Sequence, residues 1–317
     1  MTRFLLAAMF LYAAQAAAQS YPSKPVRMVV NFPPGGAADQ LGRAVGARLQ
    51  EVLGQPFLVE NRPGANGSIG AGEVAKAAPD GYTILMSSGS AIALNGLIYR
   101  NLNYDPMKAL EPVAPVASVA VFLQIRPTLA PSTLAEFIAF LRANPARLNY
   151  GTPGNGSSPH LASEMFNRAA KVQTTHVPYK GAGPALTDLL AGQIDFMFDP
   201  GVGLQHAKAG KLKLLAVGSP RRHPAYPEVP TVAEVVGAEF DADTVFGIYV
   251  PVGTPRDLAT KLNAEVGRAM QSAELKARAA AIGAQEMVLS PEAFAGRLRA
   301  DHERMGVLVK DIGLKAD

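Results

Sequence analysis

The stretch TTHVPYKGAGPALTDLLAGQIDFMFD, residues 174–199, predicts a strand, a glycine turn, a short helix and a second strand. The strands cover 174–179 and 194–198. We expect the helix to begin at Pro184, where a missing N–H costs nothing, and Gly192 to end it. A strand that leads into a glycine turn and a helix N-terminus is a general anion-binding arrangement. Because many α/β folds contain one, the stretch by itself indicates a kind of site and no identity.

Further strand–loop–helix units precede this stretch. Residues 26–32, VRMVVNF, form a near-continuous apolar run, which is typical of a strand buried on both faces of a parallel sheet. Predicted strands at 57–60 and 82–86 follow, each after a predicted helix. This order predicts an α/β fold built from βαβ units. Apolar segments at 116–125 and 246–250 are expected to carry the chain into a second domain and back.

Composition describes an ordinary globular protein. The chain has 317 residues, enough for two domains of usual size, with 48% hydrophobic and 18% charged residues. Its formal charge of +4 is too small and too scattered to indicate nucleic-acid binding, although it is compatible with an anionic ligand. The sequence contains no cysteine, which excludes disulfides and thiol chemistry.

Residues 1–20 have the pattern of a secretory signal peptide. Arg3 precedes an apolar run over 4–14, and small residues at 16–18 suit cleavage. The alternative, a transmembrane anchor, is disfavoured because the run is shorter than the ~20 residues that a span needs. We therefore expect an exported protein that is soluble after cleavage.

A strand end followed by a glycine-containing loop and a helix start recurs along the chain. These junctions lie at 32–39, 87–90, 151–160 and 179–184. All are expected at the carboxyl ends of strands, where open α/β sheets bind ligands. For each loop taken alone, a plain turn is the alternative. Besides backbone N–H groups, the donors that they offer a carboxylate are the hydroxyls of Ser87, Ser88, Thr152, Ser157 and Ser158.

Asp199 is the acidic residue best placed for a ligand, because it ends the second strand of the opening stretch. The alternative for Asp199 is a turn-forming role before Pro200 and Gly201. The sequence leaves both interpretations open.

Motifs for catalysis are missing from the sequence. Segment 66–70 has Asn where a nucleophile elbow needs its first glycine, and loop 154–158 lacks the lysine of a phosphate-binding loop. His160 and Glu164 are spaced to share a helix face, but two ligands are too few for a metal site. We therefore expect no catalytic residue, no metal and no cofactor.

Several long motifs resemble one family in the right order. HVPYKGAGPALTDLLAGQIDFMF at 176–198, FPPGGAAD at 32–39, VENRPGANGSIGAGEVAKAAPDGYTIL at 59–85 and LNYGTPGNGSSPHLASEMF at 148–166 carry the likeness. They closely resemble the tripartite tricarboxylate transporter receptors, also called the Bug family of bacterial periplasmic solute-binding proteins. The resemblance covers nearly the whole chain after the signal peptide.

This resemblance implies a type II, Venus-flytrap binding protein: two α/β lobes, a mixed sheet in each, and a hinge crossed twice. We expect residues 21–123 with 247–317 to form the first lobe and 124–246 the second. Segment 91–99 departs from the family pattern, with Gly96 where relatives tend to have proline. We expect this segment to be a loop that shapes the distal part of the pocket.

Carried over position by position, the resemblance also implies a set of ligand contacts. Ser87 and Ser88 belong to this set less firmly, because their loop varies in the family, and Tyr179 has a strand-end core role as its alternative. The other implied contacts are Phe32, Gly36, Ala37, Asp39, Thr152, Gly156, Ser157 and Gly181.

The function implied is that of a monomeric periplasmic receptor, not an enzyme. It would capture a small carboxylate (a di- or tricarboxylate, an amino acid or an aromatic acid) and deliver it to a two-component inner-membrane permease. Two alternatives stay open at this point: a ligand-sensing receptor for a signalling partner, and a secreted hydrolase on a similar fold.

Overall fold

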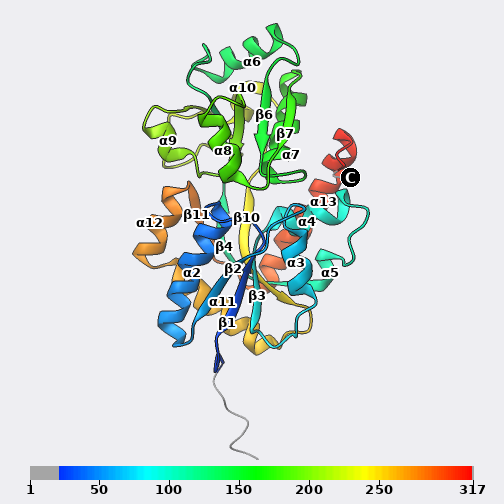
Figure 1. Cartoon of the computed structure of the whole chain (residues 1–317), viewed down its shortest axis with the longest axis vertical. Coiled ribbons are helices and arrows are strands. Elements are labelled where there is room, and N and C mark those ends of the chain that lie inside the picture. Colours follow the sequence, from blue (N-terminus) through cyan, green and yellow to red (C-terminus); the bar gives the residue numbers. More distant parts are fainter. Residues whose placement is uncertain (1–20, 316–317) are drawn as a thin grey trace, which may run out of the picture.

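The protein forms two α/β lobes, one above the other in Figure 1. The computed structural model describes residues 21–315, so the predicted signal peptide at 1–20 lies outside the described residues. Each lobe contains one sheet with helices packed against it, and each sheet has its own hydrophobic core. The predicted fold class, two α/β lobes with a mixed sheet in each, is confirmed.

The first sheet has the strand order β11-β4-β10-β3-β1-β2. Its parallel part pairs β1 with β2 and β3, and β10 joins it antiparallel to β3. The strands are β1 (Val26–Val30), β2 (Phe57–Asn61), β3 (Thr83–Ser88), β4 (Leu110–Val119), β10 (Thr244–Pro251) and β11 (Ala284–Glu286). Helices beside this sheet are α2 (Ala37–Leu53), α3 (Ser68–Ala75), α4 (Gly89–Ile98), α5 (Pro106–Ala109), α11 (Arg256–Met270), α12 (Ala273–Ala281) and α13 (Pro291–Ile312).

The second sheet has the order β7-β6-β8-β5-β9. Strands β6, β7 and β8 run parallel, while β5 is antiparallel to both of its neighbours. The strands are β5 (Phe122–Ile125), β6 (Asn149–Thr152), β7 (Thr175–Pro178), β8 (Phe196–Asp199) and β9 (Lys213–Val217). The helices of this lobe are α6 (Leu134–Ala143), α7 (Ser158–Ala170), α8 (Ala182–Leu190), α9 (Leu204–Lys208) and α10 (Val232–Val236).

The chain passes between the sheets twice. The first passage joins β4 to β5 within the predicted segment 116–125, and the second precedes β10. The expectation that 246–250 crosses between domains is wrong, because these residues lie inside β10. Gly218 N donates to Val121 O at 2.7 Å and Ala242 N to Gly218 O at 2.9 Å, which ties the two passages together. The lobe bounds 21–123 with 247–317 and 124–246 stay a prediction.

Two local expectations are corrected. Segment 91–99 is not a loop, because residues 89–98 form helix α4, capped by the Ser88 hydroxyl accepting from Ala91 N at 3.3 Å. This helix is apolar and buried on most sides, so its sequence shows no helical period. Helix α8 begins at Ala182 and not at Pro184, which is its third residue. At that position a missing N–H is still harmless.

Candidate functional site

Two adjoining cavities lie between the lobes. The inner cavity, of about 40 Å³, is lined by residues of both lobes. The outer cavity, of about 250 Å³, shares Phe32, Pro33, Asn66 and Pro153 with it. A single water needs roughly 10–15 Å³ on such a measure, so the inner cavity has room for a carboxylate group and the outer one for the rest of a small molecule. Lining the inner cavity are Phe32, Pro33, Gly36, Ala37, Ala38, Asn66, Ser88, Ser90, Pro153, Ser157, Ser158, Pro159, Ala182, Gly183, Pro200 and Phe246.

The N-termini of α2, α4, α7 and α8 all reach the inner cavity, two from each lobe. The first N–H groups of a helix have no partner within the helix, and the helix dipole places partial positive charge there. Of the four first turns, only that of α2 holds an acidic residue, Asp39. The inner cavity is therefore suited to an anion.

Asp39 shapes the loop before α2 instead of lining either cavity. Its Oδ2 accepts from Gly35 N at 2.9 Å, while Oδ1 accepts from Asn61 Nδ2 and Arg43 Nε, both at 2.9 Å. Burial alone would raise the pKa of Asp39, but these hydrogen bonds outweigh burial and the pKa is lowered. The ionised carboxylate thus holds the Gly35–Gly36 turn in place, and Gly36 caps α2.

Ser157 caps α7 at the opposite wall. Its hydroxyl accepts from His160 N at 3.3 Å and donates to Gly154 O at 2.8 Å. Thr152, which is fully buried, bonds to His176 Nε2 through Oγ1 at 2.6 Å. These contacts fix the 152–157 loop.

A stack of aromatic rings supports that loop from behind. The rings of His160 and His176 stack 3.9 Å apart, and the Tyr150 ring lies 5.0 Å from His176 and 6.5 Å from His160. Burial lowers the pKa of His160 to about 3, with a contribution from His176, and that of His176 to about 4. Both rings are therefore neutral near pH 7. Gly156 N donates to His160 Nδ1 at 3.1 Å, so the proton of His160 lies on Nε2.

Gly156 and Gly181 let the lobes approach each other. Both have positive φ, 77° and 141°. A Cβ on Gly156 would lie 1.9 Å from Ile98 Cδ1, and one on Gly181 would lie 2.7 Å from Pro33 Cγ. Ile98 and Pro33 belong to the first lobe, so with the lobes together a Cβ at Gly181 meets the ring of Pro33, whereas a Cβ at Gly156 meets the terminal methyl of Ile98, which would have to turn aside.

Asp199 and Ser87 are enclosed in the lobes. Asp199 Oδ2 accepts from Gln124 Nε2 at 3.0 Å and from Gly203 N at 2.8 Å, and burial raises its pKa to about 7. The Ser87 hydroxyl accepts from Asn31 Nδ2 at 3.0 Å and donates to Ser88 O. Neither residue lines either interlobe cavity.

The predicted site residues thus divide into two groups. Those that line the inner cavity are Phe32, Gly36, Ala37, Ser88 and Ser157, and Tyr179 lines the outer one. Those that lie behind the walls are Asp39, Ser87, Thr152, Gly156, Gly181 and Asp199. Contacts with a ligand stay a prediction for both groups, and for the second the structure adds a role in supporting and packing the walls.

Sequence reasoning missed other lining residues. Asn66 lies in the glycine-rich loop before α3, which the sequence indicated only as a turn, and Ser90 and Phe246 come from segments assigned to a loop and to a crossing. The sequence signal for Asn66 was its setting within the turn-rich segment RPGANG. In the structure, Ala65 and Asn66 both adopt positive φ there. Phe246 could not be picked out from the sequence, because β10 is mostly apolar and every residue of it is buried.

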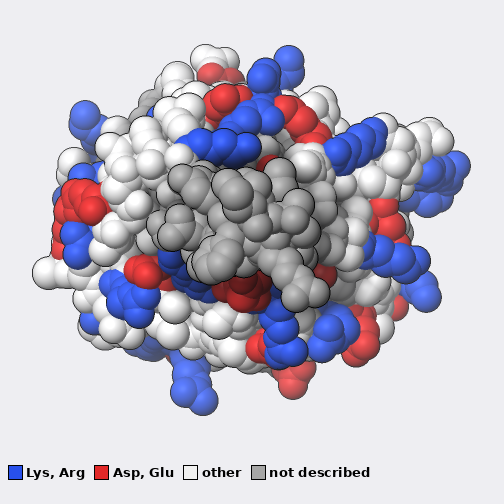
Figure 2. Space-filling view, turned by 90° about the horizontal axis from the view of Figure 1, so that it is seen from below, with Lys and Arg blue, Asp and Glu red and all other residues white. Residues whose placement is uncertain are grey.

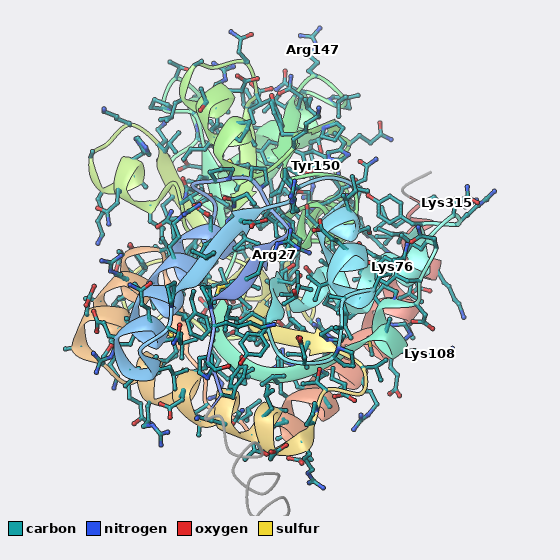
Figure 3. All side chains as sticks on the ribbon, turned by 60° about the horizontal axis from the view of Figure 1, so that its bottom comes forward. Arg27, Lys76, Lys108, Arg147, Tyr150 and Lys315 are labelled. Carbon is teal, nitrogen blue, oxygen red and sulfur yellow. The ribbon has the colours of Figure 1, made fainter. Side chains whose placement is uncertain are left out.

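The lobes touch on both sides of the cavities. Asn66 Nδ2 donates to Gly156 O at 3.0 Å, and Tyr99 OH donates to Asn155 O at 3.4 Å. On the other side, His223 Nε2 bonds to Gly283 O at 3.0 Å. The described structure is therefore a closed arrangement, and Figure 3 shows Tyr150 close to the level where the lobes meet.

Cationic side chains stay away from the inner cavity. Of the described residues, no lysine or arginine lines it, and Lys180 lines only the outer cavity. Figure 3 shows Arg147, Lys108 and Lys315 pointing away from the molecule, and in Figure 2 both signs of charge are mixed on the coloured part of the face. Any anion in the inner cavity would be held by N–H and O–H groups.

Two other features were looked for within residues 21–315: a metal site and a membrane-spanning helix. This part of the chain contains no group of three His, Cys, Asp or Glu side chains placed to hold a metal. None of its helices combines the length and the apolar character that crossing a membrane requires.

The fold and the interlobe cavities define the class of protein: a two-lobe α/β binding protein with cavities between lobes that are joined by two chain passages. The chain belongs to the tripartite tricarboxylate transporter receptors, because the model described as "Tripartite tricarboxylate transporter family receptor" matches residues 41–314. The resemblance seen in the sequence motifs is thereby confirmed.

The chain matches individual relatives over nearly their whole length. The chain is 37% identical to the protein BugT of Bordetella pertussis over 306 residues, covering 96% of this chain and 94% of that one. It matches a structure of R. palustris Rpa4515 with adipate at TM-score 0.90 and 34% identity, covering 93% and 99% of the two chains. MatC from Rhodopseudomonas palustris with bound malate matches at TM-score 0.85 and 32% identity, covering 91% and 100%.

The family and its solved relatives are periplasmic solute-binding receptors, not enzymes. The expectation of a receptor in place of an enzyme is confirmed on this ground.

Proposed function

We propose that this protein is a periplasmic receptor that binds a small carboxylate between its lobes and delivers it to a two-component membrane permease. The observation that carries the proposal is the convergence of four helix N-termini on one inner cavity lined by no described cationic side chain. Relatives solved with adipate and with malate support the same ligand class.

Closure follows from ligand contacts with both lobes. A helix N-terminus favours an anion by about 0.3–1 kcal/mol at the surface and up to ~2 kcal/mol when partly buried. Two such ends belong to each lobe, so the carboxylate gains its full stabilisation only when the lobes are together. The ligand would thus shift the protein towards the closed arrangement that a permease recognises.

The test is a calorimetric titration of the mature protein with citrate, succinate, adipate, malate, glutamate and benzoate. The matched control for each acid is its amide, which keeps the shape and lacks the charge. We expect at least one acid to bind and its amide to bind far more weakly. Linkage predicts about 2.7 kcal/mol of stabilisation at one hundred times the dissociation constant. Equal binding of acid and amide, or no binding of any acid, would overturn the proposal.

Export is part of the proposal. Removal of a signal peptide is supported by the basic Arg3, by the apolar run 4–14 that follows it and by the small residues at 16–18. Intact-mass measurement of protein from the periplasmic fraction tests this, with cleavage after Ala18 as the expected result. A protein that retains residues 1–18 and stays with the membrane would contradict it. We also propose that the mature receptor is a monomer, which light scattering would check.

A further inference from the structure

The turn between α12 and β11 of the first lobe, at Ile282 and Gly283, is seated in a socket formed by Phe122, Gly201 and His223 of the second lobe. A Cβ on Gly201 would lie 1.8 Å from Ile282 O, and one on Gly283 would lie 2.7 Å from the ring of Phe122. Figure 1 shows α12 and β11 at the top of the first lobe, below α9. The turn and the socket are therefore in close contact across the boundary between the lobes.

The imidazole of His223 connects the socket to the turn. His223 is 3% exposed, and its Nδ1 accepts from Ala225 N at 3.2 Å. Because Nδ1 acts as an acceptor, the proton of the neutral ring lies on Nε2, which donates to Gly283 O at 3.0 Å. The neutral ring thus satisfies both of its nitrogens, one within the second lobe and the other across to the first.

A protonated imidazole does not suit this arrangement. Both ring nitrogens of a charged histidine are donors, so Nδ1–H would face the N–H of Ala225 with no acceptor. The rings of Phe122 and Tyr226 lie 5.5 and 5.7 Å from the imidazole and help to exclude water. Burial lowers the pKa of His223, and the hydrogen bond to Gly283 O offsets part of this effect. The closed arrangement therefore favours the neutral ring.

Within residues 21–315, no acidic side chain forms an ion pair with His223. From α9, Lys208 reaches the Tyr226 ring, with Nζ 5.5 Å from the ring centre. From β8, the carboxylate of Asp199 accepts from Gln124 Nε2. The other charged or titratable groups on the surrounding elements are the ion pairs Arg222–Glu234, Lys276–Glu286 and Arg278–Glu274, the exposed Arg221 and Glu228, and the half-buried His206.

We propose that His223 is a pH-sensitive latch between the lobes, which its neutral ring closes by donating to Gly283 O and its protonated ring opens. The inference rests on the proposed carboxylate-binding function and adds a regulation of the same site. The socket adjoins that site, because Gly201 touches the turn while its neighbour Pro200 lines the inner cavity. Acidification would thus release the carboxylate by favouring the open arrangement.

The direction of the pH effect follows from proton linkage. With the lobes apart, the turn no longer covers His223, and its pKa should lie near the ordinary value of about 6.5. Closure lowers this pKa, so an open receptor with a protonated His223 must release a proton to close. Affinity should therefore be nearly constant above about pH 7 and fall in acid, by about 10-fold between pH 7.5 and 5.5.

The experiment is a calorimetric titration of the mature protein with citrate, succinate, adipate, malate, glutamate and benzoate at pH 7.5 and 5.5. It compares the unaltered protein with His223→Gln, whose amide can donate to Gly283 O and does not titrate in this range. Titration of the acid itself affects both proteins equally. We expect acidification to weaken binding about 10-fold more in the unaltered protein than in His223→Gln. His206→Gln, on the neighbouring α9, is the matched control and should keep the full pH dependence.

Equal pH dependence of the unaltered protein and His223→Gln would overturn the latch and leave the proposed function standing. Absence of binding by all six acids at pH 7.5 would overturn both. A second measurement needs no variant: the C2–H proton resonances of the five histidines are followed against pH with and without a bound acid. One histidine should titrate near pH 6.5 in the free protein and at lower pH in the complex. If no histidine shifts in this way, the latch is overturned even where His223→Gln does not fold.

Discussion

Gly156 of the second lobe lies directly against Ile98 of the first, so that a Cβ on Gly156 would stand 1.9 Å from Ile98 Cδ1. The contact joins the loop before α7 to the end of α4, at the edge of the outer cavity formed by Tyr99 and Asn155. Closure with a side chain at position 156 would therefore require the terminal methyl of Ile98 to turn aside, in a backbone conformation (φ 77°) that already favours glycine.

We expect Gly156→Ala to disfavour closure of the lobes, because its Cβ displaces the Ile98 methyl and its backbone conformation is strained. Affinity for the bound carboxylate should fall by about tenfold or more, the change produced by roughly 1.4 kcal/mol of lost closure energy. Both sheets should stay folded, which circular dichroism checks, while small-angle scattering should show a more open molecule with ligand present.

The matched control is Gly210→Ala. Gly210 also has positive φ, 70°, but no atom lies within 4 Å of its Cβ position. It should share the backbone strain of Gly156→Ala, about 1 kcal/mol, and leave affinity unchanged. If both variants lose affinity equally, closure at Gly156 is not the cause.

Removing the charge of Asp39 should loosen the loop before α2. Asp39→Asn weakens the bonds to Gly35 N and Arg43, which we expect to cost about 1–3 kcal/mol of folding free energy. Because the folded-state pKa is lowered, the stabilisation is complete above the unfolded pKa of about 3.9 and is lost as pH falls through the lower folded value. Urea unfolding of the two proteins should differ at pH 7 and converge in acid. A gap that stays constant with pH would contradict this.

The contribution of Asp199 to stability should change with pH in the opposite direction. Burial raises its pKa to about 7, so between pH 4 and 7 the folded protein keeps a proton that the unfolded chain loses. Its contribution to stability therefore falls as pH rises over this range. Relative to the unaltered protein, Asp199→Asn should gain more than about 1 kcal/mol between pH 4 and 8, since one pKa unit corresponds to about 1.36 kcal/mol. Urea unfolding across this range checks it, and a gain that is independent of pH would refute the raised pKa.

Ser157→Ala should damage both stability and binding. It removes the cap of α7, which costs about 1 kcal/mol, and frees the Gly154 carbonyl beside the cavity. Ser272→Ala is the control, because Ser272 caps α12 in the same way, accepting from Leu275 N at 3.3 Å, and lines neither interlobe cavity. Titrations should show weaker carboxylate binding for Ser157→Ala alone. Equal affinities of the two variants would make Ser157 a purely structural cap.

Much of the fold could be predicted because its signals are local. The apolar run of β1 acts within a few residues of chain, and the structure confirms a strand there; α8 lies in the predicted segment but begins two residues before the expected Pro184. Helix α4 was not predicted because Ile92, Ala93 and Leu94 are all buried. Burial of successive residues removes the periodicity that identifies a surface helix. Residues 246–250 were misplaced because an apolar run suits a central strand and a crossing equally well.

The sequence by itself determined the family, the two α/β lobes and the helix N-termini that suit a carboxylate, since these follow from residue order and short-range backbone preferences. Only the tertiary structure decided which residues line the interlobe cavities. Asn66 and Gly156 are 90 positions apart and meet because the chain passes twice between the sheets and the lobes close on each other. Side-chain burial and hydrogen-bond direction arise from that packing, so the unpaired oxygen of Asn66 and the enclosed carboxyl of Asp199 have no trace in the sequence.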